Sequence, residues 1–190
     1  YEQGGMKATG NSLDMALEGK GFFEVLTPAG PRLTRKGTFS MSADGTLVTT
    51  DGYPVLKRQT LPTQPGQAEA NPESRIIRVN DASPITVSQK GEIYQNNDVL
   101  AQLSIVEFED NDHLKKIGHS LYAVTDPQVG RLLNPQSEVH QGFLENSNIN
   151  IVKEMTDMIQ TTRNFESAQR VIKAYDEMDG KLVNDVPKLG

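Results

Sequence analysis

The stretch that decides the fold is Ile151-Val-Lys-Glu-Met155-Thr-Asp-Met158-Ile159-Gln-Thr-Thr162-Arg-Asn-Phe165-Glu-Ser-Ala168-Gln-Arg-Val-Ile172-Lys-Ala-Tyr175, near the end of a chain of 190 residues. Apolar or small residues recur in it in steps of three and four, the spacing of one face of an α-helix, and the opposite face is charged. No proline interrupts the pattern before Pro187, and only Gly180 weakens its end. The stretch predicts one long amphipathic helix over residues 146–186, with Asn148 or Asn150 as its N-cap.

The apolar face of this helix is the first candidate functional surface. At ~1.5 Å per residue, about 33 helical residues make a rod on the order of 50 Å long, which exceeds the diameter of a domain of this size. Part of the face must then meet another helix, and we interpret it as an assembly seam. Folding of the helix back onto its own sheet is the alternative that periodicity leaves open. The seam residues are Ile151, Met155, Met158, Ile159, Thr162, Phe165, Ile172, Tyr175 and Met178.

Residues 1–145 have the pattern of β structure. Short alternating or apolar runs are separated by glycine, as at Asp44-Gly45 and Asp51-Gly52. Asp-Gly between such runs favours tight hairpins, because type I′ turns need positive φ at both central residues. The pattern predicts a mainly β fold, a meander or small barrel. The expected strands are Leu13–Leu17, Phe22–Leu26, Arg32–Arg35, Thr38–Met41, Thr46–Thr49, Tyr53–Leu56, Arg75–Val79, Pro84–Val87, Glu92–Gln95, Val99–Phe108, Leu121–Val124 and Glu138–Leu144.

Two segments of this region are expected to be loops. Residues 59–74 contain three prolines and almost no apolar side chains, which predicts an exposed loop. Leu114–Tyr122 is interpreted as a loop that leads into a strand.

Thr86–Ile93 echoes Ser40–Leu47, each being a strand, a turn glycine and a strand. The echo indicates either an internal duplication or two hairpins that converged on one pattern.

Composition argues against several classes of function. The formal net charge of −6 gives no support for binding to nucleic acid or to an anionic membrane. Cysteine is absent, which removes disulfides, thiolate chemistry and the common zinc sites. No apolar run approaches the roughly 18 residues that span a bilayer. The chain opens at Tyr1 in a polar, Gly-rich stretch, and we expect a natural amino-terminal segment to precede it, although processing would give the same start.

No set of residues in the sequence assembles an active site. Gly19-Lys20-Gly21 begins like a phosphate loop, but Glu24 stands where a third glycine is needed, so a turn is the better interpretation. Gly118-His119-Ser120 begins like a nucleophile elbow, but Tyr122 replaces its second glycine. We therefore expect no enzyme.

Charged and titratable residues suggest no ligand either. None of the three histidines, His113, His119 and His140, lies at helical i, i+4 spacing or beside a carboxylate cluster, so we expect no metal and no cofactor. The basic trio of Arg32, Arg35 and Lys36 is interpreted as a solvated strand face. A contact with an acidic neighbour is the alternative for this trio.

Two blocks of sequence together resemble a known family. The first includes Gly10-Asn-Ser-Leu-Asp14 and Leu33-Thr-Arg35-Lys-Gly37, and the second runs from Gln141-Gly142-Phe-Leu144-Glu145 into the helix. Both resemble the bacterial flagellar rod and hook proteins, with the helix closest to that of the proximal-rod protein and the distal-rod protein next. The residues that carry the resemblance include Asn11, Leu13, Asp14, Gly19, Gly21, Phe22, Phe23, Arg35, Gly37, Gly45, Gly52, Gly142, Glu145, Ser147 and Asn148.

This resemblance implies a structural subunit. Residues 1–145 would form an outer domain. The helix at 146–186 would pair with an amino-terminal helix missing from this sequence, with other copies of the chain and with neighbouring rod or hook subunits. The subunits would leave the cell through the flagellar type III export apparatus and build a periplasmic tube that transmits torque from motor to hook. A secreted β-rich binding or adhesion module with an oligomerising helical tail is the alternative.

Overall fold

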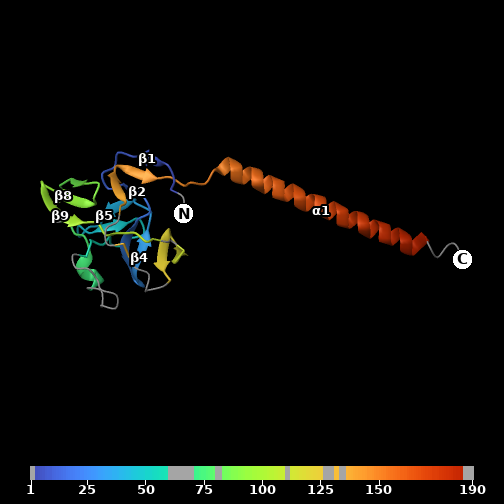
Figure 1. Ribbon diagram of the computed structural model, residues 1–190, viewed down its shortest axis with the longest axis horizontal. Helices are drawn as coiled ribbons and strands as arrows, with labels where there is room; N and C mark the ends of the chain where they lie inside the picture. The colour runs from blue at the N-terminus through green and yellow to red at the C-terminus, as the bar shows by residue number, and fades with distance from the viewer. Residues whose placement is uncertain are drawn as a thin grey trace. The chain divides into compact units, whose positions relative to one another are not determined.

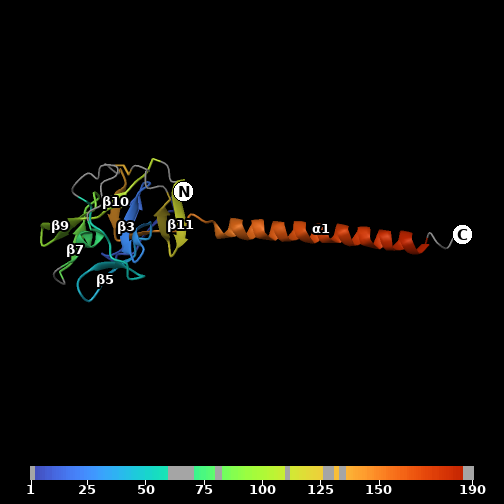
Figure 2. The same cartoon turned by 90° about the horizontal axis from the view of Figure 1, so that it is seen from below.

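The computed structural model describes residues 3–59, 71–79, 83–109, 112–125, 131–132 and 136–185, with helix side chains described up to Gly180. Its contacts divide the chain into two units, Tyr1–Asn148 and Ile149–Gly190. The described part of the first unit is mainly β structure, and the second contains one continuous helix, as Figure 1 and Figure 2 show. Residues 60–70 of the predicted loop lie outside the described residues.

The β unit consists of short antiparallel strands. They are β1 (Met6–Ala8), β2 (Met15–Glu18), β3 (Phe22–Thr27), β4 (Gly30–Thr34), β5 (Phe39–Met41), β6 (Leu47–Thr49), β7 (Ile85–Val87), β8 (Glu92–Gln95), β9 (Asp98–Gln102), β10 (Ile105–Val106), β11 (Leu114–Gly118), β12 (Leu121–Val124), β13 (Glu138–Gln141) and β14 (Phe143–Glu145). The largest sheet has the order β10-β3-β4-β12-β11, and the smaller ones are β7-β8-β9, β5-β6, β13-β2 and β1-β14. The mainly β, meander-like prediction is therefore confirmed, but the strands that the structure describes stay in separate sheets and do not close into a barrel.

Two clusters of buried apolar side chains form the core. Phe22 and Phe23 are successive residues of β3 and so point to opposite faces, one into each cluster. Phe23 packs edge-on against Phe39, with ring centroids 5.2 Å apart, and Phe22 packs in the same way against Tyr122 at 5.4 Å. Fully burying each such side chain contributes roughly 1.5–3 kcal/mol. Strand β3 is thus the shared wall of both clusters.

Two hairpin turns in the described part of the chain have positive φ at both central residues, but they are not the predicted ones. They are Asn96-Asn97, between β8 and β9, and His119-Ser120, between β11 and β12. At Asp44-Gly45 only the glycine has positive φ, 77°, so the type I′ prediction is wrong there. The reason is a longer turn: the Gly45 amide donates to the Ser42 carbonyl at 3.0 Å and the Ser42 amide to Thr46 at 2.9 Å.

The sequence echo corresponds to one turn geometry used twice. Between β7 and β8 the Gly91 amide donates to the Ser88 carbonyl at 2.9 Å, and the Ser88 amide donates to Glu92 at 2.9 Å. This repeats the bonds of Ser42, Gly45 and Thr46. A hairpin of this length needs glycine at the same place, which explains the shared pattern.

Several predicted strand boundaries are wrong. Leu114–Gly118 is strand β11 and not a loop; it is an edge strand whose lysines hide its alternation. The run Val99–Phe108 is broken after Gln102 into β9 and β10, and β1 was not predicted. Glu138–Leu144 breaks at Gly142, where φ is 80°.

Two other predicted strands form little regular structure. Tyr53–Leu56 and Ile76–Val79 contribute only isolated bridges, because each pairs with a different neighbour at successive residues. Pro72–Arg75 is a 3-10 helix capped by Asn71, whose side chain accepts from the Glu73 amide. This helix includes Arg75, the first residue of the predicted strand Arg75–Val79, and its side chain is buried.

Helix α1 runs from Ile151 to Asp185. Asn150 is its N-cap, as one of the two predictions had it: the side-chain oxygen accepts from the amides of Val152 at 3.1 Å and Lys153 at 3.2 Å. The helix begins later than residue 146 because the preceding residues belong to β14 and the segment up to the cap. No helix in the described part of the chain is long and apolar enough to cross a membrane.

Candidate assembly site

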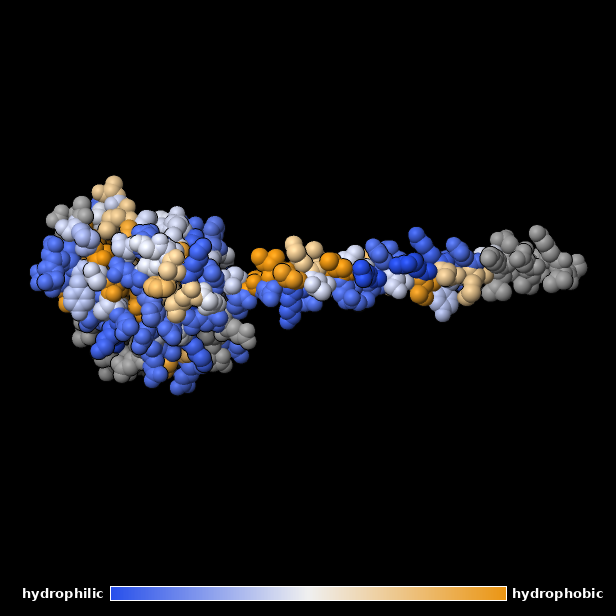
Figure 3. All heavy atoms as spheres, turned by 90° about the horizontal axis from the view of Figure 1, so that it is seen from above, coloured by the Kyte–Doolittle hydropathy of each residue, from blue (hydrophilic) through white to orange (hydrophobic). Residues whose placement is uncertain are grey.

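All nine proposed seam residues lie in α1, and their large apolar side chains are exposed. Exposure runs from 54% at Ile159 to 68% at Ile151. Figure 3 shows that apolar residues recur along the helix. Thr162 donates its hydroxyl to the Met158 carbonyl at 2.9 Å, so its polar atom is satisfied within the helix and its methyl is left for packing. An exposed apolar stripe of this length is typical of a protein–protein contact surface.

The second part of the site is the root of the helix, where the chain leaves the β unit. Glu145 is the last residue of β14. Its Oε2 accepts from Arg35 Nε at 3.0 Å and lies 2.9 Å from Arg35 Nη2, while its Oε1 accepts from the Gly4 amide at 3.1 Å. The side chains of Arg35 and Glu145 are less than one-fifth exposed, so this ion pair is partly shielded from solvent.

Arg35 joins this root to the rest of the motif residues. Its Nη1 donates to the carbonyls of Gly19 at 2.8 Å and Gly21 at 2.6 Å, and its guanidinium lies 5.8 Å from the centre of the Phe22 ring. The solvated-face interpretation is therefore wrong for Arg35, and the alternative, an acidic neighbour, is right. The cause is the fork of donors on arginine, which can serve a carboxylate and two carbonyls together.

The Gly19–Gly21 segment is a turn, as predicted, and not a phosphate loop. Its carbonyls face the Arg35 cation. Its amides are already used, Gly19 donating to Gln3 Oε1 at 3.1 Å and Gly21 to Ser137 Oγ at 2.7 Å. No amide of these two glycines is left to bind an anion.

Other motif residues fix the strands next to the root. Asp14 is buried, accepts from Thr9 Oγ1 at 2.7 Å, and its carbonyl accepts from the Gly142 amide at 2.7 Å. Gly37 lies against β2, because a Cβ there would come within 1.5 Å of the Met15 carbonyl oxygen. The remaining motif residues have separate places: Asn11 accepts from the Leu13 amide, Phe23 is in the core, Gly45 and Gly52 are in turns, and Ser147 and Asn148 follow β14.

The sequence did not predict the buried ionic cluster around Glu24. This carboxylate is fully buried, is paired with Arg75, accepts from Ser104 Oγ at 2.7 Å and lies 3.1 Å from Arg131 Nη1. Burial by itself raises the pKa of Glu24, but the guanidiniums of Arg131 and Arg75 and the hydrogen bonds from Arg75 and Ser104 outweigh it and lower the pKa below its usual range. The available signal was a carboxylate inside the apolar run Phe22–Leu26.

The three histidines lie in different surroundings. His113 and His119 are exposed, and His119 Nδ1 is 3.7 Å from an Asp51 oxygen. His140 Nε2 is 2.8 Å from Glu18 Oε2, and Glu138 lies in the same group. The premise that no histidine is near a carboxylate cluster is therefore wrong for His140, because strand pairing joins residues that are distant in sequence.

The comparisons with known proteins match both parts of this site. Residues 16–95 match the model described as flagellar hook protein FlgE/F/G D1 domain, and residues 140–185 match the one described as flagellar basal body rod FlgEFG protein C-terminal. The basal-body rod protein FlgG of Buchnera aphidicola is 31% identical over 188 residues, which cover 96% of this chain and 68% of the relative. The chain belongs to the flagellar basal-body rod protein family.

Other members of the rod family match over similar lengths. FlgG of Agrobacterium fabrum is 35% identical, over 94% of this chain and 66% of the relative, and FlgF of Rhizobium meliloti is 33% identical, over 98% and 71%. The resemblance predicted from the sequence is thus confirmed at the family level, and these identities favour neither rod protein over the other. In this rod-family chain the Arg35–Glu145 ion pair joins the two matched regions, 16–95 and 140–185.

Proposed function

We propose that this protein is a structural subunit of the bacterial flagellar basal-body rod. Family membership and the exposed apolar stripe of α1 support the proposal. In the assembled rod the seam packs against helices of neighbouring rod or hook subunits and of other copies of the chain, and α1 forms the inner wall. Residues 1–145, the outer domain expected from the sequence, form the outer wall.

A subunit of this kind has a mechanical role, and that role requires no catalytic site. Torque applied to α1 must pass into the β unit through the segment that follows Glu145. The bonds from Arg35 and from the Gly4 amide hold that residue to the body of the unit. We infer a periplasmic tube that carries torque from motor to hook, built from subunits exported through the flagellar type III apparatus, with no enzymatic activity.

The seam is the single observation that carries the proposal, and a pair of double variants tests it. Phe165→Asp with Ile172→Asp puts two charges on the seam, where burying them in a helix–helix contact is costly. Gln160→Asp with Ser167→Asp is the matched control, with the same added charge and the same spacing of seven residues, and neither position is three or four residues from a member of the seam. Each is expressed in place of the wild-type protein in the source bacterium.

We expect the seam variant to abolish rods in electron micrographs and swimming in soft agar. The control is expected to keep both. Circular dichroism of the purified variants should show the same β signal as the wild type. Rods and motility that survive the seam substitutions would overturn the proposal, and so would loss of the β signal, which would place the seam in the core of the β unit.

A further inference from the structure

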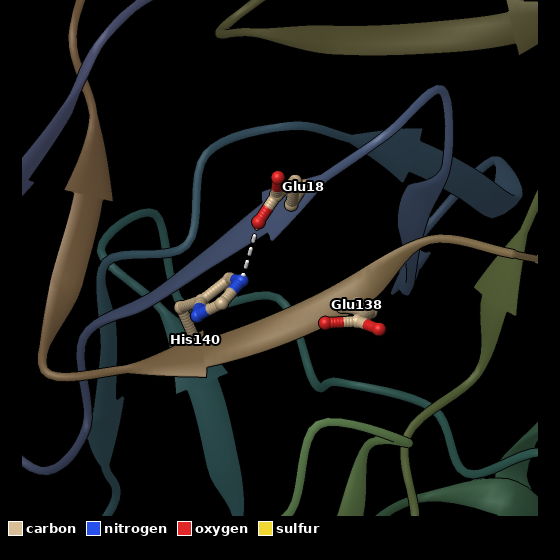
Figure 4. A group of neighbouring side chains, drawn as sticks. All are labelled: Glu18, Glu138 and His140. Carbon is tan, nitrogen blue, oxygen red and sulfur yellow. Dashed lines mark hydrogen bonds and ion pairs between the residues drawn. The ribbon is translucent and has the colours of Figure 1, made fainter.

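The surface of the β2–β13 ladder gathers two carboxylates and an imidazole. Glu18 and Glu138 are directly opposite each other in the register, and His140 follows Glu138 by two residues, which places it on the same face of β13. The group is drawn in Figure 4, with Glu18 reaching His140 across the ladder. One ligand atom from each residue can be chosen so that all three lie within 4.8 Å of one another.

The charges of this group are unbalanced as it stands. Two carboxylates that face each other across neighbouring strands repel. Glu18 has the His140 ring at 2.8 Å, but the Glu138 side chain has neither a cation nor a hydrogen-bond donor among the described residues. A divalent cation between the three side chains would turn this repulsion into attraction.

The positions of the strands suit such a cation. Residue 16, which faces His140 across the ladder, is alanine, so the imidazole has room to lean towards Glu18. The His140 ring also packs at a steep angle, 78°, to the Phe143 ring, with centroids 6.3 Å apart, and this contact limits its rotation. Ligand atoms on a tetrahedral zinc ion are about 3.3 Å apart. Small rotations of the exposed Glu18 and Glu138 side chains are therefore enough to close the group around an ion.

We propose that Glu18, Glu138 and His140 form a binding site for a divalent transition-metal ion of the zinc type. Imidazole nitrogen together with carboxylate oxygens favours such ions over magnesium or calcium, which prefer oxygen alone. The ion joins β13 to β2 immediately before the chain turns at Gly142 into β14. It therefore strengthens the ladder that leads to the root of the helix. This inference does not depend on the assignment to the rod.

The test is titration of the untagged 190-residue chain with zinc chloride in a calorimeter. Glu138→Gln and His140→Gln each remove one ligand from an exposed or half-buried position, and His119→Gln is the matched control, because His119 faces a single carboxylate, Asp51. We expect one zinc per chain for the wild type and His119→Gln, and at least about tenfold weaker binding for the two ligand variants. Zinc should also raise the melting temperature of the wild type but not of His140→Gln. The proposal is overturned if no zinc binds up to about 1 mM, or if His140→Gln binds zinc as tightly as His119→Gln does.

Discussion

At the scale of single residues, the charges that matter most are those that the fold takes out of water. Glu24 finds Arg75, Ser104 and Arg131 at separations of 51, 80 and 107 residues. No local pattern encodes such partners, because they are brought together only by the order of strands in the sheets. The family resemblance singled out Gly19, Gly21 and Arg35 as motif residues. It could not predict that the Arg35 guanidinium donates to the carbonyls of both glycines.

The Glu24 cluster makes stability depend on acid. The folded-state pKa of Glu24 lies below the unfolded value of about 4.3, so its stabilisation is complete above that value and is lost as pH falls through the folded pKa. We expect the urea midpoint of the wild type to fall steeply on acidification below about pH 4.3. The measurement is urea unfolding followed by circular dichroism from neutral to acidic pH.

Glu24→Gln should unfold more easily at neutral pH, by about 3 kcal/mol or more, because Arg75 is left buried without its counter-charge. The same variant should lose part of the acid dependence. Glu73→Gln, at an exposed position on the 3-10 helix, is the control and should behave like the wild type. An unchanged acid dependence in Glu24→Gln would show that other carboxylates cause it.

Even a conservative substitution of Arg35 should destabilise the protein. Arg35→Lys keeps the charge but loses the fork that serves Glu145, Gly19 and Gly21 at once, so we expect a loss of about 2 kcal/mol in unfolding free energy. Neighbouring Lys36 donates its ammonium to Thr50 Oγ1 at an exposed site, and this is its one side-chain bond within the described residues. Lys36→Gln should therefore cost less than about 0.5 kcal/mol. A double-mutant cycle of Arg35→Lys with Glu145→Gln, measured by urea unfolding, should give a non-zero coupling energy. A coupling energy of zero would show that the Arg35–Glu145 ion pair does not contribute to stability.

At the scale of elements, what could be predicted followed the strength of the periodic signal. Helix α1, with its repeating stripe and its Asn150 cap, was predictable to within a few residues at its ends. Strands β8 and β12 were predicted with the bounds that the structure has. Strand β11 was missed because an edge strand carries solvent-facing lysines. Strand β1 was missed because its three residues are too few for a pattern, and among the described strands its one partner is β14, far along the chain.

Two glycines of the motif are required for different reasons, one because a Cβ would clash and the other because its φ is positive. Gly37 has an ordinary φ but no room, since a Cβ would lie 1.5 Å from the Met15 carbonyl oxygen, whereas Gly52 has open space and a φ of 82°. Gly37→Ala should therefore cost more than about 3 kcal/mol, because β2 must shift, and Gly52→Ala only about 1–2 kcal/mol. Urea midpoints of the two variants measure the difference. Equal losses would mean that the strand next to Gly37 moves aside freely.

At the scale of the whole molecule, the sequence pattern predicted β structure followed by a long helix. It did not predict how the β unit closes, that is, which strands near its two ends pair with each other. Its first strand pairs with its last, Met6 opposite Glu145, and the second pairs with the one before, Met15 opposite Gln141. Register across more than a hundred residues depends on which faces are buried, and the whole core sets that.

This closure brings the points where the chain enters and leaves the β unit together. The Asn146 amide donates to the Gly5 carbonyl at 2.8 Å, and the two strands that flank this bond run antiparallel. A protein engineer can treat the unit as a cassette. If residues 4–146 are inserted into a surface loop of an unrelated host protein, the two ends of that loop need to be only about as far apart as neighbouring antiparallel strands, roughly 5 Å, so host and guest should both fold.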